Sequence, residues 1–226
     1  MKVLTCLVAL ALGAPADFTV KKVTSGKPDF YVSNSAYLEF SAKHPLSGAI
    51  NPALKGFATR EQARWLKDAK EMQKELGKPT AAWEQEIGMS PEWNTPRLVS
   101  IVISRYDYSG GAHPNHGVEV MNFGLVRGRA RQLKLADFFT SGFNSSSHVS
   151  KLVVAKLKKV QGADWVQSGE LKKLDNKMLE RFTPSATGLT WHFNPYDVGP
   201  YAAGDFEVKL ILNELGPKFN RAMLAR

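Results

Sequence analysis

The chain has 226 residues, of which 30 are basic and 21 are acidic, and its formal net charge at pH 7 is +9. A chain of this length can bury one sizeable hydrophobic core or two small ones. The basic residues are spread along the chain, and no aromatic-rich basic strand or recognition helix accompanies them, so a typical nucleic-acid-binding domain is excluded and no nucleic acid is expected as a partner. A solvated basic surface is the favoured interpretation over a site for an anionic polymer.

The N-terminus predicts a secretory signal peptide over residues 1–16, and hence a periplasmic or extracellular protein. Lys2 is followed by an apolar run and by an A-x-A cleavage site that ends at Ala16. The run is too short to cross a membrane, so no membrane span is expected. Cys6 is the only cysteine, so the exported protein would have no disulfide and no thiolate metal site. Loss of Lys2 lowers the net charge by one, from +9 to +8.

The clearest helix is predicted over residues 52–76. Asn51 is placed as its N-cap and Pro52 at its first position, and Gly77 closes it. Apolar residues recur at helical spacing, which indicates a face packed on a sheet. This predicted face comprises Leu54, Ala58, Trp65, Ala69, Met72 and Leu76.

Strands are predicted along the rest of the chain. Leu98–Tyr106 is β-branched and mostly apolar, as a central strand should be. A looser strand over Val118–Val126 leads to a turn at Arg127-Gly128, and a hairpin turns at residues 186–188. The further strands are expected at 179–184, 189–193 and 206–212.

A short helical turn over 133–139 and a second long helix over 145–160 complete the predicted elements. Because helices fall between groups of strands rather than alternating with them, we predict an α+β fold, with a mainly antiparallel sheet and two longer helices packed on one face. The predicted organisation is a signal peptide, an N-terminal α+β half, a C-terminal half packed with the first as one module, and a tail. The boundaries are 1–16, 17–105, 106–216 and 217–226.

Two segments differ from ordinary core elements: Tyr106–Asn115, YDYSGGAHPN, and Phe193–Gly204, FNPYDVGPYAAG. Each combines turn-forming Gly and Pro with aromatic residues. Gly permits positive φ and Pro fixes φ, so this composition predicts rigid, shaped loops. Loops of this kind on a rigid scaffold are where function is usually found.

The first segment has residues that suggest catalysis, but their spacing does not favour it. Asp107, Ser109 and His113 lie within seven residues of one Gly-rich loop, without a G-x-S-x-G elbow, so a rigid hydrolytic triad is not expected. His113 and His116 are spaced as in some zinc sites, but Pro114 excludes a regular helix and a third ligand is needed. We expect no metal and no cofactor, and for the loop histidine a hydrogen bond to a backbone carbonyl.

The first segment resembles the Y-x-Y-[ST]-G-G-A-H-x-N signature of a family of exported bacterial domains. The stretches 122–125, NFGL, 133–139, LKLADFF, and 189–204 continue the likeness, which extends from about Asp29 to Leu215. This family includes the outer domain of lysozyme-sensing, RsiV-type anti-sigma factors and the accessory region that precedes the deacetylase in some peptidoglycan deacetylases. The resemblance implies an α+β fold, a role at the cell envelope and no catalytic centre of the domain's own.

The same resemblance admits lysozyme as a partner, but the charge disfavours it. Animal-type lysozyme is strongly cationic, and two proteins of like charge repel each other and lose electrostatic steering. The basic chain is better suited to a wall polymer, an anionic lipid surface or an acidic protein.

We therefore predict a secreted, non-enzymatic binding domain of the bacterial cell envelope that recognises a cell-wall glycan or an envelope-associated protein. The two loops are expected to shape one surface, with aromatic faces and hydrogen-bonding side chains. Its predicted ligand-binding residues are Tyr108, His113, Asn115, Asn194, Tyr196 and Tyr201. Three alternatives remain: the loops only brace the fold, the chain is a cell-wall glycan hydrolase or deacetylase with a site at His113 and His116, or it has an independent signalling role.

Overall fold

The structure, a computed structural model, describes residues 17–225, so the predicted signal peptide lies outside the described residues. The chain divides into two compact units, each made from separate segments. The first unit contains the described residues up to Ser90 together with Ile103–Asn115, and the second contains Pro91–Val102 together with the chain from His116 onward. None of the described helices is long and apolar enough to cross a membrane.

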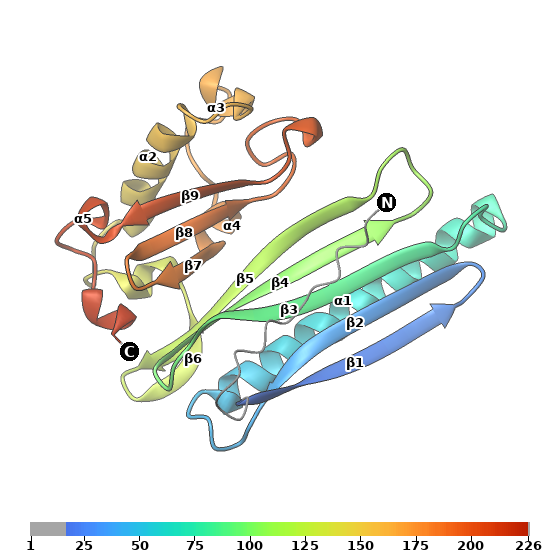
Figure 1. The fold of residues 1–226 in the computed structure, drawn as a ribbon, viewed down its shortest axis with the longest axis horizontal. Coiled ribbons are helices and arrows are strands. Elements are labelled where there is room, and N and C mark those ends of the chain that lie inside the picture. The colour runs from blue at the N-terminus through green and yellow to red at the C-terminus, as the bar shows by residue number, and fades with distance from the viewer. Residues whose placement is uncertain (1–16, 226) are drawn as a thin grey trace. The chain divides into compact units, whose positions relative to one another are not determined.

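Six strands form one sheet in chain order (Figure 1). They are β1 (Phe18–Lys27), β2 (Tyr31–Phe40), β3 (Trp83–Asn94), β4 (Leu98–Tyr108), β5 (Asn115–Val126) and β6 (Arg129–Leu133). The pairs β1–β2 and β5–β6 are antiparallel, whereas β2 and β3 are parallel. The predicted mainly antiparallel sheet is therefore only partly correct. A long helix joins β2 to β3, and this is the kind of crossover that a parallel pair requires.

Strands β1, β2, β3 and β6 were not predicted, and β2 shows why. Its inward positions include Ser33 and Ser35, both buried, so the alternation of apolar and polar residues is not visible in the sequence. In β1, which lies at an edge of the sheet, nearly every residue is exposed, so the strand has no buried alternating set of apolar residues.

Helix α1 (Ser47–Leu76) begins five residues earlier than predicted. Asn51 is not its N-cap: the Oδ1 of Asn51 accepts a hydrogen bond from the backbone nitrogen of Phe40 at 2.8 Å, and its Nδ2 donates to the carbonyl of Phe40 at 2.9 Å. Pro52 accordingly lies inside the helix. The end of the helix is as predicted, because Gly77 takes a φ of +76° and donates its N–H to a carbonyl of the last turn.

The buried face of α1 is more polar than the sequence indicates. Leu76, predicted to be part of it, is 70% exposed, whereas Gln62 is buried. The Nε2 of Gln62 donates to the carbonyls of Val23 and Ser33, and the hydroxyl of Ser33 donates to the Oε1 of Gln85 at 2.7 Å. A hydrogen-bonded polar group can occupy a buried position at little cost, so these residues complete the packing of α1 against the sheet.

The second unit holds a separate antiparallel sheet of three strands, β7 (Phe182–Ser185), β8 (Gly188–Phe193) and β9 (Phe206–Ile211). Its helices are α2 (Ser145–Leu157), α3 (Asp164–Gln167), α4 (Asn176–Glu180) and α5 (Leu212–Leu215), with 3₁₀ turns η1 (Leu135–Phe138), η2 (Tyr201–Ala203) and η3 (Arg221–Leu224). The longer helices do not share one sheet face as predicted: α1 packs on β2 and α2 on β9.

The predicted turns of the second unit are confirmed. Arg127 and Gly128 both have positive φ, at +50° and +75°, as a two-residue hairpin between β5 and β6 requires. Ser185 pairs with Gly188 at the end of the β7–β8 hairpin. The start of the predicted strand over 179–184 is instead the end of α4.

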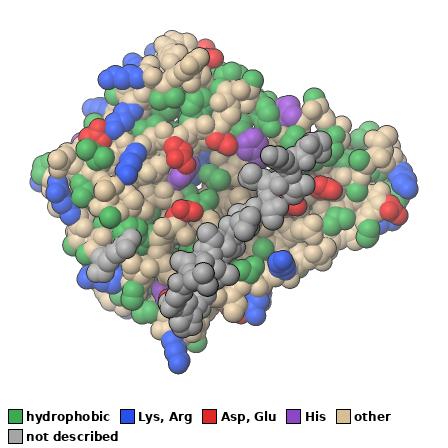
Figure 2. Space-filling view, in the orientation of Figure 1, with side chains coloured by type: hydrophobic (Ala, Val, Ile, Leu, Met, Phe, Trp, Pro, Cys, Tyr) green, Lys and Arg blue, Asp and Glu red, His purple; other side chains and the backbone are tan. Residues whose placement is uncertain are grey.

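The basic side chains on the face drawn in Figure 2 are spread out, as the sequence favours. Figure 2 shows the Lys and Arg side chains in separate small groups across one face, rather than in one continuous patch.

Candidate functional site

The loop between β8 and β9, residues 194–205, begins with a hydrogen-bonded turn. The backbone nitrogen of Asn194 donates to the Oδ2 of Asp197 at 2.7 Å, and the nitrogen of Asp197 donates to the carbonyl of Asn194 at 3.0 Å. Asp197 thus has the turn-capping role that is common for Asp. Between the two lies Tyr196, with a φ of +68°, a conformation that residues other than glycine rarely adopt. The turn therefore holds a tyrosine in a strained backbone geometry.

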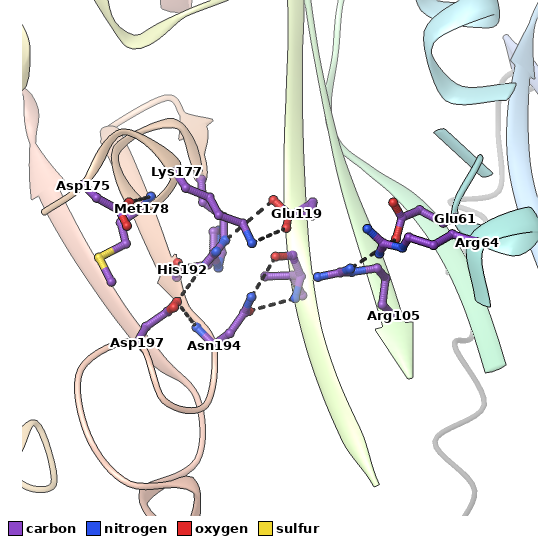
Figure 3. Close-up of polar contacts among 12 residues, drawn as sticks. Glu61, Arg64, Arg105, Glu119, Asp175, Lys177, Met178, His192, Asn194 and Asp197 are labelled. Atoms are coloured by element: carbon purple, nitrogen blue, oxygen red, sulfur yellow. Dashed lines mark hydrogen bonds and ion pairs between the residues drawn. The ribbon is translucent and has the colours of Figure 1, made fainter. Parts of the chain in front are cut away.

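The side chain of Asn194 fastens this turn to β5. Its Oδ1 accepts a hydrogen bond from the backbone nitrogen of Val118 at 2.8 Å, and its Nδ2 donates to the carbonyl of Val118 at 3.1 Å. Gly117 makes the approach possible, because a Cβ at that position would lie 2.9 Å from the amide of Asn194. Asn194 thus acts as a structural clamp (Figure 3), and its predicted role in ligand binding stays a prediction.

A nearly buried arginine supports the same turn. The side chain of Arg181 is 2% exposed and forms an ion pair with Asp197, which is 19% exposed. The Nε of Arg181 lies 4.0 Å from the carboxylate of Glu119 on β5, and Glu119 is also 3.6 Å from the Nζ of Lys177 (Figure 3). A buried charge of this kind is stable only when it is paired, so removal of either partner is strongly destabilising. The turn is held by both an amide clamp and a buried ion pair.

The loop presents an aromatic surface, which we call the aromatic platform and define as His116, Tyr196, Tyr201 and Asp205. Tyr196 is 54% exposed, and its ring centroid lies 5.6 Å from that of Tyr201 at an interplanar angle of 41°. Tyr201 meets His116 edge-on, at 5.7 Å. The Nε2 of His116 donates to the Oδ2 of Asp205 at 3.2 Å, and its Nδ1 lies 3.4 Å from the hydroxyl oxygen of Tyr201. The platform combines exposed rings with a carboxylate.

A second histidine lies on the three-stranded sheet. The Nε2 of His192 is 2.9 Å from the hydroxyl of Thr183, and its Nδ1 is 3.1 Å from the Oε1 of Glu207. Burial lowers the pKa of His192 below its ordinary value of 6.5, although the carboxylate of Glu207 acts in the opposite direction. The neutral imidazole fits this network, because Nδ1 then donates to the carboxylate and Nε2 accepts from the hydroxyl.

The first signature segment lies in the other unit. Tyr108 is partly buried at the end of β4, and the Nδ2 of Asn115 donates to the Oδ2 of Asp107 at 3.3 Å. The Nδ1 of His113 donates to the carbonyl of Pro114 at 3.0 Å, which confirms the predicted role of this loop histidine. These contacts brace the segment within the first unit.

Two of the six predicted site residues, Tyr196 and Tyr201, are brought together. Tyr108, His113 and Asn115 belong to the first unit, and their meeting with the other loop in one surface stays a prediction. The sequence did not indicate which side chains lie beside these tyrosines. In the sequence His116 suggests only a zinc ligand, and no local pattern indicates that it pairs with Asp205 across 89 residues.

Comparison with known families gives two matches to family models. Residues 25–116 match the deacetylase PdaC model, and residues 136–212 match a protein family of unknown function, DUF3298. The second match includes the loop 194–205, which contributes Tyr196, Tyr201 and Asp205 to the platform, whereas His116 lies in the first match. Comparison with curated proteins finds no significant match. That the chain resembles the RsiV type of these domains in particular stays a prediction.

Two solved structures of DUF3298 proteins share the fold. A member from Bacteroides fragilis is 19% identical, with a TM-score of 0.58 over 91% of this chain and 96% of that one. A member from Pseudomonas aeruginosa is 17% identical, with a TM-score of 0.61 over 92% and 97%. At this level of identity the likeness extends to the fold alone.

Proposed function

We propose that the chain is a non-catalytic binding module of the bacterial cell envelope, whose aromatic platform holds a cell-wall glycan. The match of residues 25–116 to the deacetylase PdaC model supports a role at the envelope, as does the resemblance of both signature segments to exported domains. Export through the N-terminal signal sequence is part of this proposal.

The observation that carries the proposal is the backbone of Tyr196. A tyrosine at positive φ persists only where its surroundings enforce it, and such strain is concentrated at ligand sites. Here the surroundings are the Asn194 clamp and the Arg181–Asp197 ion pair. The residue is 54% exposed, so more than half of its surface is accessible to a ligand. The strain is accounted for if the ring is held ready for a ligand.

The platform has the composition of a small-ligand site. Aromatic side chains supply large, rigid apolar faces, and a few polar groups fix the orientation of the ligand. The C–H faces of sugar rings can lie on Tyr196 and Tyr201. The carboxylate of Asp205 can accept hydrogen bonds from sugar hydroxyl groups, and the hydroxyl of Tyr201 can both donate and accept.

The test is sedimentation of the purified protein with insoluble peptidoglycan. Loss of one aromatic anchor typically costs more than about 1.4 kcal/mol of binding free energy, which corresponds to roughly a tenfold weaker Kd. We expect a loss of this size for Tyr196→Ala and for Tyr201→Ala. Ile211→Ala is the matched control, because Ile211 lies in the same unit and is also an exposed apolar residue, at 47%. Unchanged binding by both tyrosine variants would remove the platform from the proposal.

Export is tested separately by the intact mass of the secreted protein. Cleavage after Ala16 leaves Asp17 as the first residue. A secreted chain whose mass still includes residues 1–16 would contradict this part of the proposal.

An enzyme is the second candidate, because the PdaC match includes His113 and His116. The function would then be hydrolysis or deacetylation of cell-wall glycan at these histidines. Among residues 17–225, no three His, Cys, Asp or Glu side chains are grouped as metal ligands in the structure. Elemental analysis after native purification tests this candidate. One zinc per chain that is lost in His113→Ala would favour the enzyme over the binding module.

A further inference from the structure

We propose that the aromatic platform prefers glycan whose amino sugars carry a free amine over the same glycan in its N-acetylated form. This inference rests on the proposed function and names the class of sugar that the site selects. The distinguishing group is an ammonium, which is positively charged, in place of a neutral acetamide.

The paired rings supply the first argument. An ammonium is attracted to the face of an aromatic ring when it lies within about 6 Å of the ring centroid. Tyr196 and Tyr201 are 5.6 Å apart and tilted by 41°, so a group that approaches the platform can lie close to both rings. Tyr196 offers the more accessible ring, because it is 54% exposed.

The carboxylate supplies the second, independent argument. The side chain of Asp205 is 57% exposed, and its Oδ2 accepts a hydrogen bond from His116. A carboxylate can accept about four hydrogen bonds, so Asp205 has capacity for a further donor. His116 places this carboxylate beside the rings, because the same imidazole contacts Tyr201. An ammonium gains from both the carboxylate and the rings, whereas a carboxylate or phosphate on the ligand is repelled by Asp205.

The net positive charge of the chain opposes this preference, so a preference that is observed must arise at the platform itself. A protein with a net charge of +9, or +8 after removal of residues 1–16, is repelled by a polycation, so bulk electrostatics oppose binding to an aminated glycan. A measured preference for the aminated form must therefore come from a local arrangement. Hydrolysis of the acetamide, which yields the amine and acetate, is the class of reaction that supplies such a ligand.

The experiment compares binding to particulate chitin with binding to the same particles after chemical deacetylation. The platform is expected to bind the deacetylated particles at least about tenfold more tightly than the acetylated particles. Asp205→Asn should bring the ratio close to one, because it should weaken binding to the deacetylated particles more than binding to the acetylated ones. Asp164→Asn is the matched control, since it changes the net charge equally at an exposed aspartate of the same unit, and it should keep the preference.

Three outcomes would overturn the inference in different ways. Equal or tighter binding to the acetylated particles removes the preference but leaves glycan binding in place. A preference that survives in Asp205→Asn removes the assignment to this carboxylate. Absence of binding to either polymer and to peptidoglycan removes the proposed function together with the inference.

Discussion

Comparing the stability of Tyr196→Gly with that of Tyr196→Ala tests whether the backbone at this position is strained. At a φ of +68° the Cβ of an L-residue crowds the neighbouring carbonyl oxygen, at a cost of roughly 1–2 kcal/mol, whereas glycine has no such cost. Tyr196→Ala removes the ring and keeps the strain. Tyr196→Gly removes both.

The magnitudes follow from the exposure of the ring. A fully covered tyrosine buries roughly 150–250 Å², and here 54% of the residue is exposed, so roughly 90 Å² of contact is lost on truncation. At about 25 cal/mol per Å² this corresponds to at most about 2 kcal/mol for Tyr196→Ala. For glycine, the relief of strain exceeds the entropy that it adds to the unfolded chain, about 0.4–1 kcal/mol. We therefore expect Tyr196→Gly to be more stable than Tyr196→Ala by about 1 kcal/mol.

Thermal unfolding measures this difference as about 2–4 °C in melting temperature for a chain of this size. Tyr201 provides the matched control, because it lies in η2 and does not have positive φ. There glycine should be less stable than alanine, by roughly 0.5–1 kcal/mol. If Tyr196→Gly is less stable than Tyr196→Ala, the strain argument fails, and with it the main support for a preorganised platform.

Three further predictions concern the second unit. Burial lowers the pKa of His192, so the folded state binds fewer protons than the unfolded chain. Its contribution to stability is complete above the unfolded pKa of about 6.5 and is lost as the pH falls below it. The melting temperature of His192→Gln should therefore change less between about pH 7 and pH 5 than that of the wild type. An equal change with pH in both proteins would contradict this. Asn194→Ala leaves the backbone of Val118 without two hydrogen bonds and should cost about 1–3 kcal/mol in unfolding free energy, so unchanged chemical denaturation would rule out the clamp. Gly199→Ala places a Cβ 2.1 Å from the carbonyl oxygen of Gly162 and should cost about 1–3 kcal/mol or more; a melt equal to that of the wild type would show that the loop yields easily.

What could be predicted from the sequence is local. Gly77 ends α1 and Arg127-Gly128 turns the β5–β6 hairpin because these features depend on the backbone conformations available to a few adjacent residues. The apolar strand from Leu98 could be predicted for the same reason, since its run of β-branched and apolar residues is contained within the segment. Tyr196 and Tyr201 could also be paired in advance, because one short loop contains both.

Only the tertiary structure decided which distant groups meet. Asn51 has the sequence context of an N-cap, yet it binds the backbone of Phe40, and nothing near Asp205 indicates that its partner is His116. The parallel pairing of β2 and β3 likewise depends on where α1 returns the chain. A polar side chain bonds to whatever group the packing of the core brings within about 3 Å of it. That packing depends on the fit of many apolar residues along the chain, and no local pattern records it.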